Sequence, residues 1–390
     1  MSPLLCGGLF FWPIFDAMIA ITNCKFFTES GLEINQSVFI KDNKIEKISG
    51  DDVPDGYDVV DAKGAWLSSG LIDLQIYGSG GNLFSAYPSA ETLAQMDLDL
   101  IGKGTTSFLA CVATNSMEIV YQAMDAAKKY KPDAKGFLGL HLEGPYLNPK
   151  RLGAHVPEFI RTATLDEVKA ILDYAEGTVR MMTIAAELQS DEVIAYLLEQ
   201  GVVLSLGHSD ASFGQATAAY NKGITTTTHL FNAMPSIHHR APNLPGAVLN
   251  HPSARASIIA DGVHVDFEVV KMAHKLMQER LFLITDAVTS CHIGPYKHQL
   301  QGNRFVTPEG TISGSNITLL DAVRNCVEYC GISLKNALNM ASLYPSEVIG
   351  ISEFFGEIAV GKNADLIFLD DKFVLQKVFI GGVEQMMIDN

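Results

Sequence analysis

Basic residues are scarce in this sequence, and their scarcity excludes several classes of partner. The 390 residues include 28 Lys and Arg against 44 Asp and Glu, a formal net charge of −16 at pH 7. A surface with this charge repels nucleic acid and anionic membranes, so we expect neither as a partner. An anionic small-molecule substrate would need a few local cations to hold it.

Cysteine pairs of the Cys-x-x-Cys type are absent, and the six cysteines are dispersed along the chain. In a chain of this length, such cysteines are typical of the free thiols of a cytoplasmic protein. Cys326 and Cys330 stand one helical turn apart. We expect them to share an apolar helix face rather than to bind a metal.

A long apolar stretch at residues 3–22 lacks the features of a targeting signal or a membrane span. It has no basic N-terminal region, and glycine, proline and aspartate interrupt it. It therefore fits neither a signal peptide nor a transmembrane helix. A strand-like pattern begins at Met18, and we expect residues 1–17 to be a non-native or disordered extension.

Short strand patterns occupy both ends of the chain. Residues 18–68 read as strands joined by turns, with a hairpin signal at Asp42-Asn43, and residues 351–390 look similar. We predict that the two ends pair to form one small β domain, a β-sandwich. The chain is 47% hydrophobic, which is ample for a second and larger core between them.

A different pattern fills residues 69–350, where apolar strands alternate with amphipathic helices. We predict eight strands, at residues 71–78, 105–113, 136–144, 179–187, 202–209, 224–233, 255–265 and 281–288. Continuous apolar strands are typical of a parallel sheet buried on both faces. Eight strand–helix units in series favour a closed (β/α)8 TIM barrel over an open sheet. The predicted fold class is α/β.

Polar and titratable side chains stand where these predicted strands end. That edge carries the active site in barrels of this type. The residues are Asp73, Gln75, Glu143, Glu187, His208, His229, His264 and Asp286. His208 and His229 are separated by 229 − 208 = 21 residues, close to one strand–helix unit. We therefore expect the two imidazoles at the same height on adjacent strands.

Glu143, His208 and His229 are the predicted metal ligands. One carboxylate and two imidazoles with open positions suit catalytic zinc, and iron, manganese, cobalt or nickel are alternatives. A bound metal lowers the pKa of water from ~15.7 towards ~7, and Asp286 would take the proton and return it to a leaving nitrogen. A lone strand-end histidine is usually structural, and Asp286 alone could equally be a helix N-cap. The prediction therefore depends on the whole set converging.

Several longer segments occur in an order that matches a known family. They are HLEGPYLNPKRLGAH (141–155), GHSDA (207–211), HLFNAMPSIHHR (229–240), IIADGVHVD (258–266), LITDA (283–287) and SGSNITLLDAVRNCVE (313–328). From about Met18 to the C-terminus, the chain resembles the N-acetylglucosamine-6-phosphate deacetylases. GLIDLQIYGSGG (70–81) and GEIAVGKNADLIFLD (356–370) resemble the opening and closing signatures of the wider amidohydrolase superfamily.

The resemblance implies a role for each matched position. Glu143, His208 and His229 match the metal ligands, Asp286 matches the catalytic acid/base, and His155 matches a residue that helps to polarise the acetyl carbonyl. The implied substrate contacts are Asn232, the backbone of Ala233, His264, Arg240 and, from the first strand, Gln75.

Arg240 matches an arginine that reaches the substrate phosphate from the neighbouring subunit of a homodimer. A guanidinium group pairs well with phosphate, so this match explains how an acidic protein could bind an anionic sugar phosphate. His238 and His239 stand beside it and could add donors.

The first strand departs from the wider superfamily. Many members carry His-x-His there, whereas this chain has Asp73-Leu74-Gln75. Glutamine is a poor metal ligand, so we expect one tightly bound divalent metal per subunit. The sequence leaves open whether a second ion binds weakly near Asp73 and Gln75.

The reaction that the resemblance implies is hydrolysis of N-acetyl-D-glucosamine 6-phosphate to D-glucosamine 6-phosphate and acetate, in amino-sugar catabolism and cell-wall sugar recycling. One alternative keeps the chemistry and changes the substrate, to another N-acyl sugar phosphate such as the galactosamine analogue or to a cyclic amide. A second alternative is a non-catalytic protein that binds sugar phosphates on the same barrel.

Overall fold

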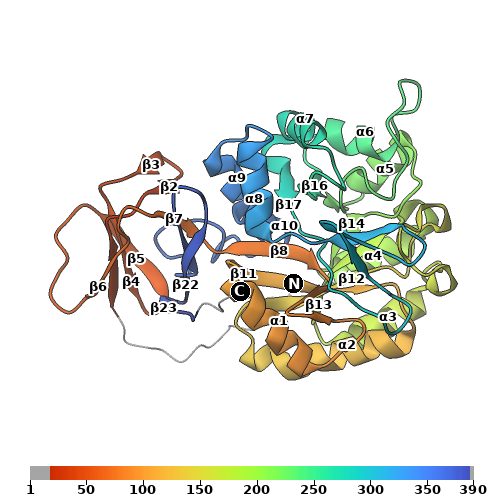
Figure 1. Ribbon diagram of the computed structural model, residues 1–390. Helices are drawn as coiled ribbons and strands as arrows, with labels where there is room; N and C mark the ends of the chain where they lie inside the picture. Colours follow the sequence, from red (N-terminus) through yellow and green to blue (C-terminus); the bar gives the residue numbers. More distant parts are fainter. Residues whose placement is uncertain (1–17, 387–390) are drawn as a thin grey trace, which may run out of the picture.

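A computed structural model describes residues 18–386, so the prediction for residues 1–17 lies outside the described residues. Figure 1 shows a larger body of strands and helices beside a smaller body made of strands. Both ends of the described chain belong to the smaller body, and the middle of the chain forms the larger one. The positions 68 and 350 for the domain boundaries stay a prediction.

The larger body is built on a parallel sheet whose strands follow one another in chain order. They are β8 (Leu71–Ile76), β11 (Thr105–Ala113), β12 (Phe137–Glu143), β13 (Val179–Ile184), β14 (Val203–Leu206), β15 (Thr226–Thr227), β16 (Arg255–Ile258) and β17 (Leu281–Leu283). The sheet closes beyond the end of β17, because Ile76 bridges Ala287 in parallel and the Asp286 N–H donates to the Gln75 carbonyl at 2.9 Å. The predicted (β/α)8 barrel is confirmed.

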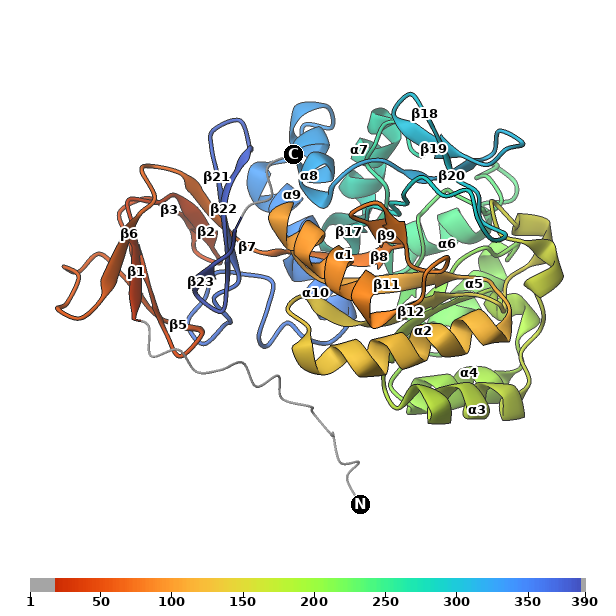
Figure 2. The same cartoon turned by 60° about the horizontal axis from the view of Figure 1, so that its bottom comes forward.

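Helices surround this sheet (Figures 1 and 2). They are α1 (Ala90–Gly102), α2 (Met117–Tyr130), α3 (Leu165–Ala175), α4 (Asp191–Glu199), α5 (Phe213–Asn221), α6 (Asn243–Asn250), α7 (Phe267–Met277), α8 (Leu319–Glu328), α9 (Leu334–Ala341) and α10 (Leu343–Val348). Several begin at a side chain that accepts a hydrogen bond from a free backbone N–H, as Ser89 does for α1 and Ser190 for α4. Each helix buries an apolar stripe against the sheet, which gives the barrel its core.

The smaller body, called here the β body, consists of the strands at the two ends of the described chain. One sheet has the order β5 (Lys44–Ser49), β4 (Ser37–Lys41), β1 (Ile19–Thr22), β6 (Asp58–Asp61), and a hairpin joins β2 (Phe26–Thr28) to β3 (Gly31–Glu33). The other sheet has the order β23 (Val383–Glu384), β22 (Leu375–Ile380), β21 (Leu366–Leu369), β7 (Trp66–Ser69). Because β7 pairs antiparallel with β21, the two ends share one sheet, as predicted.

A three-stranded antiparallel sheet follows β17 and was not predicted from the sequence. Its strands are β18 (Gln299–Gln301), β19 (Arg304–Val306) and β20 (Ile312–Ser315), at the edge of the larger body in Figure 2. A short hairpin of β9 (Gly78–Ser79) and β10 (Asn82–Leu83) follows β8. Both segments contribute residues to the barrel mouth, the end of the barrel where the strands terminate.

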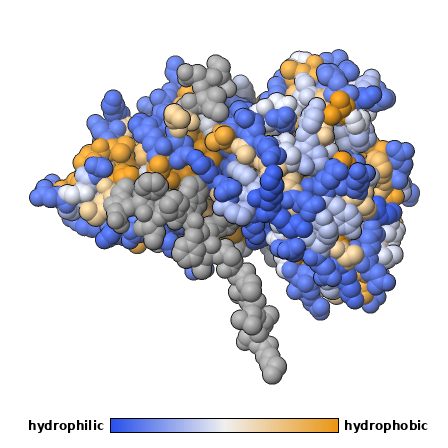
Figure 3. Space-filling view, turned by 90° about the horizontal axis from the view of Figure 1, so that it is seen from below, coloured by the Kyte–Doolittle hydropathy of each residue, from blue (hydrophilic) through white to orange (hydrophobic). Residues whose placement is uncertain are grey.

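The polarity of the surface and the state of the cysteines agree with the expectations from the sequence composition. Figure 3 shows one face on which the barrel is largely hydrophilic and hydrophobic residues gather over the β body, whose exposed apolar residues include Leu32, Ile34 and Val59. Within residues 18–386, the five cysteines are free and buried, Cys326 and Cys330 among them. In the same part of the chain, no helix combines the length and the apolar character that crossing a bilayer requires.

Candidate metal centre and active site

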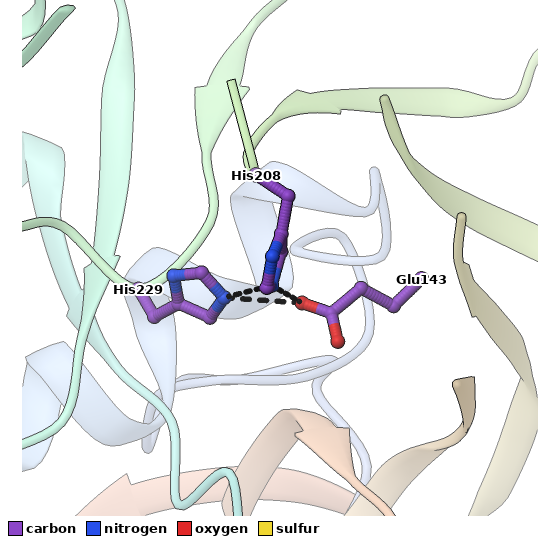
Figure 4. A group of neighbouring side chains, drawn as sticks. All are labelled: Glu143, His208 and His229. Carbon is purple, nitrogen blue, oxygen red and sulfur yellow. Dashed lines mark hydrogen bonds and ion pairs between the residues drawn. The ribbon is translucent and has the colours of Figure 1, made fainter. Parts of the chain in front are cut away.

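Glu143, His208 and His229 converge at the barrel mouth (Figure 4). Glu143 is the last residue of β12, and the two histidines follow β14 and β15. Glu143 Oε1 lies 3.3 Å from His208 Nε2 and 3.1 Å from His229 Nε2, and the two Nε2 atoms are 3.1 Å apart. All three side chains are buried. The structure thus brings together the three residues predicted as metal ligands.

The spacing of these three atoms fits a divalent cation. Nitrogen and oxygen ligands lie about 2.0–2.2 Å from a tetrahedral zinc ion, which places neighbouring ligand atoms about 3.3–3.5 Å apart. The observed separations of 3.1–3.3 Å are close to that value. The donor set of one carboxylate oxygen and two imidazole nitrogens also suits zinc and its neighbours in the periodic table.

The His208 imidazole is held in the orientation that a metal ligand requires. Its Nδ1 donates to the Arg151 carbonyl at 2.8 Å, which directs Nε2 towards Glu143. The Arg151 side chain pairs with Asp210 at 2.7 Å. Glu187, one of the strand-end residues, accepts from the Asp210 N–H at 2.8 Å. Glu187 therefore supports the turn that carries His208 and is not part of the group formed by Glu143, His208 and His229.

Three of the site residues lie in loops rather than in strands, which corrects the predicted strand ends. The strands predicted at 202–209, 224–233 and 281–288 end sooner, at Leu206, Thr227 and Leu283. His208, His229 and Asp286 follow with left-handed φ angles of 45°, 33° and 54°. Such a conformation costs a non-glycine residue about 1–3 kcal/mol and often marks functional sites.

Asp286 lies beside the group formed by Glu143, His208 and His229 without belonging to it. Its Oδ1 accepts from Gln75 Nε2 at 2.8 Å, and the same Nε2 is 3.0 Å from Glu143 Oε1. Burial has the largest influence on Asp286 and raises its pKa; His229 opposes this shift and Glu143 adds to it. A carboxyl group whose pKa is raised suits proton transfer.

His155 is buried against the other oxygen of Glu143. Its Nε2 donates to Glu143 Oε2 at 2.9 Å, and within residues 18–386 its Nδ1 has no hydrogen-bond partner. Burial and the neighbouring His208 lower the pKa of His155. For Glu143, burial alone would raise the pKa, but His208 and His155 outweigh it and hold the pKa well below its usual range. The carboxylate form of Glu143 is therefore favoured.

The predicted substrate contacts separate into two groups. Asn232, Ala233 and His264 line a cavity of about 180 Å³, and Glu143, His208 and His229 line the same cavity. His264 is oriented there by Asp261, whose Oδ2 accepts from His264 Nδ1 at 2.7 Å. Arg240, by contrast, is exposed on the loop between β15 and α6 and is not among the described residues that line the cavity of its own chain.

Three aromatic residues of this cavity were missed in the sequence: Tyr77, Tyr296 and His298. The Tyr77 hydroxyl contacts Glu143 Oε2, and His298 Nδ1 lies 2.8 Å from Ser313 Oγ. Tyr77 could have been found, because it stands two residues after Gln75 and strand side chains repeat with a period of two. Tyr296 and His298 precede β18 in an irregular segment that carries no such signal.

Comparison with known proteins agrees with this geometry. Residues 66–384 match the sequence profile of the Amidohydrolase family. An N-acetylglucosamine-6-phosphate deacetylase from Haemophilus influenzae is 33% identical over 375 residues, which cover 93% of this chain and 98% of that protein.

Solved structures give the same result. The crystal structure of N-acetylglucosamine-6-phosphate deacetylase from Pasteurella multocida matches with a TM-score of 0.90 and 32% identity, covering 94% of this chain and 99% of that one. A mutant deacetylase from Mycobacterium smegmatis, in complex with N-acetyl-D-glucosamine-6-phosphate, matches with a TM-score of 0.87 and 29% identity over 94% of this chain and 99% of that one.

Proposed function

The chain belongs to the amidohydrolase family, and we propose that it hydrolyses N-acetyl-D-glucosamine 6-phosphate to D-glucosamine 6-phosphate and acetate. The observation that carries this proposal is the convergence of Glu143, His208 and His229 beside Asp286 in one cavity. The chain is also similar to deacetylases over nearly their whole length.

We propose that Glu143, His208 and His229 hold one divalent metal per subunit, with zinc as the first candidate. When bound, such an ion polarises a carbonyl group and lowers the pKa of water. The amide of Gln75 supports a single ion, because its N–H groups point at both Glu143 and Asp286, where a second cation would need an oxygen ligand. Asp73 is also engaged, since it accepts from the Thr285 hydroxyl at 2.5 Å.

We assign both proton transfers of the proposed hydrolysis to Asp286. Its carboxylate accepts a proton as the water oxygen bonds to the acetyl carbon, and it delivers that proton to the nitrogen as the C–N bond breaks. His155, buried beside Glu143, is proposed to help polarise the acetyl carbonyl. The departing amine and acetate then carry all the atoms of substrate and water.

We assign substrate binding to residues of both subunits of the proposed dimer. Asn232, the Ala233 backbone, His264 and Gln75 would hold the sugar phosphate within one subunit. We propose a homodimer in which Arg240 reaches the phosphate in the neighbouring subunit's cavity, which agrees with its exposure and its position outside its own cavity. A cytoplasmic location agrees with free, buried thiols and with a phosphorylated substrate.

An acetate-release assay tests this function. The purified protein is given N-acetyl-D-glucosamine 6-phosphate, its galactosamine analogue or unphosphorylated N-acetylglucosamine, with and without a chelator and with zinc added back. We expect fastest release from the glucosamine 6-phosphate substrate, loss with chelator and recovery with zinc. Absence of acetate from all three substrates with zinc-loaded protein would support a non-catalytic binding protein instead. Faster release from the galactosamine analogue would change the substrate assignment.

A further inference from the structure

Tyr77 follows the last residue of β8 and reaches the barrel mouth. Its backbone N–H donates to the Ala287 carbonyl at 2.9 Å, in the contact that closes the barrel. Its ring is buried, with 7% exposure, and belongs to a small apolar cluster that includes Leu83, Cys111 and Val288. The backbone and the ring therefore both fix where the hydroxyl group lies.

The two oxygens of Glu143 have different surroundings. Oε1 faces His208 Nε2 and His229 Nε2, the proposed metal ligands. Oε2 accepts from His155 Nε2 at 2.9 Å and from the Tyr77 hydroxyl. Oε1 is thus directed at the proposed metal position, with Gln75 Nε2 also 3.0 Å away, while Oε2 is held by His155 and Tyr77.

The direction of the hydrogen bond between Tyr77 and Glu143 follows from Glu143 itself, because its ionised carboxylate can only accept. Gln75 Nε2, which can only donate, lies 3.2 Å from the Tyr77 hydroxyl oxygen. The two hydrogens of this amide have closer acceptors in Asp286 Oδ1 at 2.8 Å and Glu143 Oε1 at 3.0 Å. Gln75 and Tyr77 thus each donate to Glu143, at Oε1 and at Oε2 respectively.

We infer that Tyr77 is a positioning residue that holds Glu143 in the orientation required of a metal ligand. This inference rests on the proposed function, because it requires the Glu143, His208 and His229 set to bind the metal. Groups that hydrogen-bond to a metal ligand fix its orientation, and their loss typically weakens metal affinity about 10–100-fold. Without its hydroxyl partner, Glu143 would have more orientations available before the metal binds.

A matched pair of variants separates this role from packing. Tyr77→Phe removes the hydroxyl and leaves the ring in its apolar cluster. Tyr130→Phe makes the same change at another buried tyrosine, whose hydroxyl donates to Asp97 Oδ2 at 2.7 Å. Tyr130 and Asp97 lie on α2 and α1, away from the cavity. Both variants lose one tyrosine–carboxylate hydrogen bond, but only one bond involves a proposed metal ligand.

The experiment measures the zinc dissociation constant of metal-free wild-type protein and of both variants, by competition with a chromogenic chelator. We expect Tyr77→Phe to bind zinc about 10–100-fold more weakly, and Tyr130→Phe to bind it as the wild type does. Tyr77→His, which restores a ring donor, should recover part of the lost affinity. Thermal unfolding of the metal-free proteins shows whether each variant is folded.

Each outcome has a distinct meaning. If the wild type binds zinc and Tyr77→Phe binds it equally well, the role of Tyr77 is refuted while the proposed function stands. If the wild type binds no zinc, the proposed function fails first. A crystal structure of the zinc-loaded wild type tests the same inference without a substitution: the Tyr77 hydroxyl should lie within about 2.5–2.7 Å of Glu143 Oε2. A separation beyond hydrogen-bonding distance would overturn it.

Discussion

The barrel mouth buries charged side chains on strained turns, whereas the β body buries apolar side chains on regular strands. In the β body, Phe368 and Phe379 pack with ring centroids 5.2 Å apart. At the barrel mouth, Glu143 is buried among imidazoles, and His208 and His229 adopt left-handed φ angles. Charge burial and strain both lower stability, while apolar burial raises it.

This contrast predicts that substitutions in the two regions have different effects. Substitutions at the mouth should change metal binding or turnover while the protein stays folded. Substitutions in the β body should change stability while metal binding persists. Enzymes commonly lose stability at the residues that carry their chemistry, so some mouth variants should be more stable than the wild type.

The largest expected effect is on turnover, at Asp286. Asp286→Asn removes the group that accepts and returns the proton, and general acid–base catalysis typically contributes about 10²–10⁴-fold. We expect kcat for acetate release to fall by about that factor, with zinc content and thermal stability maintained. Metal analysis and calorimetry of the same preparation provide the control. Wild-type turnover in this variant would remove Asp286 from the mechanism.

In the β body, the largest expected effect is on stability. Phe379→Ala should lower the free energy of unfolding by about 3–5 kcal/mol, because it leaves a cavity in a closely packed core. Phe354→Ala is the matched control, since Phe354 is 39% exposed. Denaturant titration measures both, and zinc affinity of the folded protein should be unchanged. A large drop in zinc affinity would show that the two bodies are coupled.

The β body also contains one buried carboxyl group, whose ionisation should make the stability of the protein depend on pH. Asp365 accepts from the Gly381 N–H at 2.7 Å, and burial raises its pKa to about 6. The folded protein therefore binds this proton more tightly than the unfolded chain does. The stability that Asp365 contributes is present below about pH 4 and is lost as the pH rises through about 6.

Asp365→Asn should accordingly gain stability relative to the wild type between about pH 4 and pH 8. The expected shift in the difference of unfolding free energies is up to about 3 kcal/mol, from roughly two pKa units. Denaturant titrations of both proteins across this pH range measure it. A difference that does not vary with pH would mean that Asp365 is ionised in the folded protein.

The smallest expected effect concerns Arg240, which we propose acts in the cavity of the neighbouring subunit. Arg240→Ala should raise KM for the sugar phosphate about 10–100-fold with a smaller change in kcat, because a charge-assisted hydrogen bond contributes about 1.5–3 kcal/mol. An equimolar mixture of Arg240→Ala and Asp286→Asn subunits tests the neighbouring-subunit role. If Arg240 acts across the interface, mixed dimers should contain a cavity with Asp286 intact and a partner arginine, and acetate release should recover in part. No recovery in a mixture that exchanges subunits would place Arg240 elsewhere.

The sequence predicted the barrel well where burial is continuous. The strand predicted at 105–113 matches β11, whose nine residues are all buried. The strand predicted at 224–233 fails beyond Thr227, because His229 and Phe231 turn through left-handed φ angles that an apolar pattern does not encode. The 21-residue spacing of His208 and His229 still predicted their convergence, since it counts one strand–helix unit whatever the form of the turn.

Other parts of the site depend on contacts between distant segments. The period-two spacing places Tyr77 at the barrel mouth, but its contact with Glu143 joins segments 66 residues apart, which no local pattern indicates. Tyr296 and His298 enter the cavity from an irregular segment before β18. The proposed role of Arg240 requires a second chain. The motif resemblance predicted the metal ligands and the acid/base, and it gave no prediction for the residues that position them.

The anomalous diffraction of zinc in crystals of the wild-type protein tests most directly whether Glu143, His208 and His229 bind one metal ion. We expect one strong peak per subunit, about 2.0–2.2 Å from Glu143 Oε1, His208 Nε2 and His229 Nε2. Absence of a peak at these three atoms in zinc-loaded crystals would contradict it. A second peak of equal height beside Asp73 and Gln75 would contradict the single-metal site.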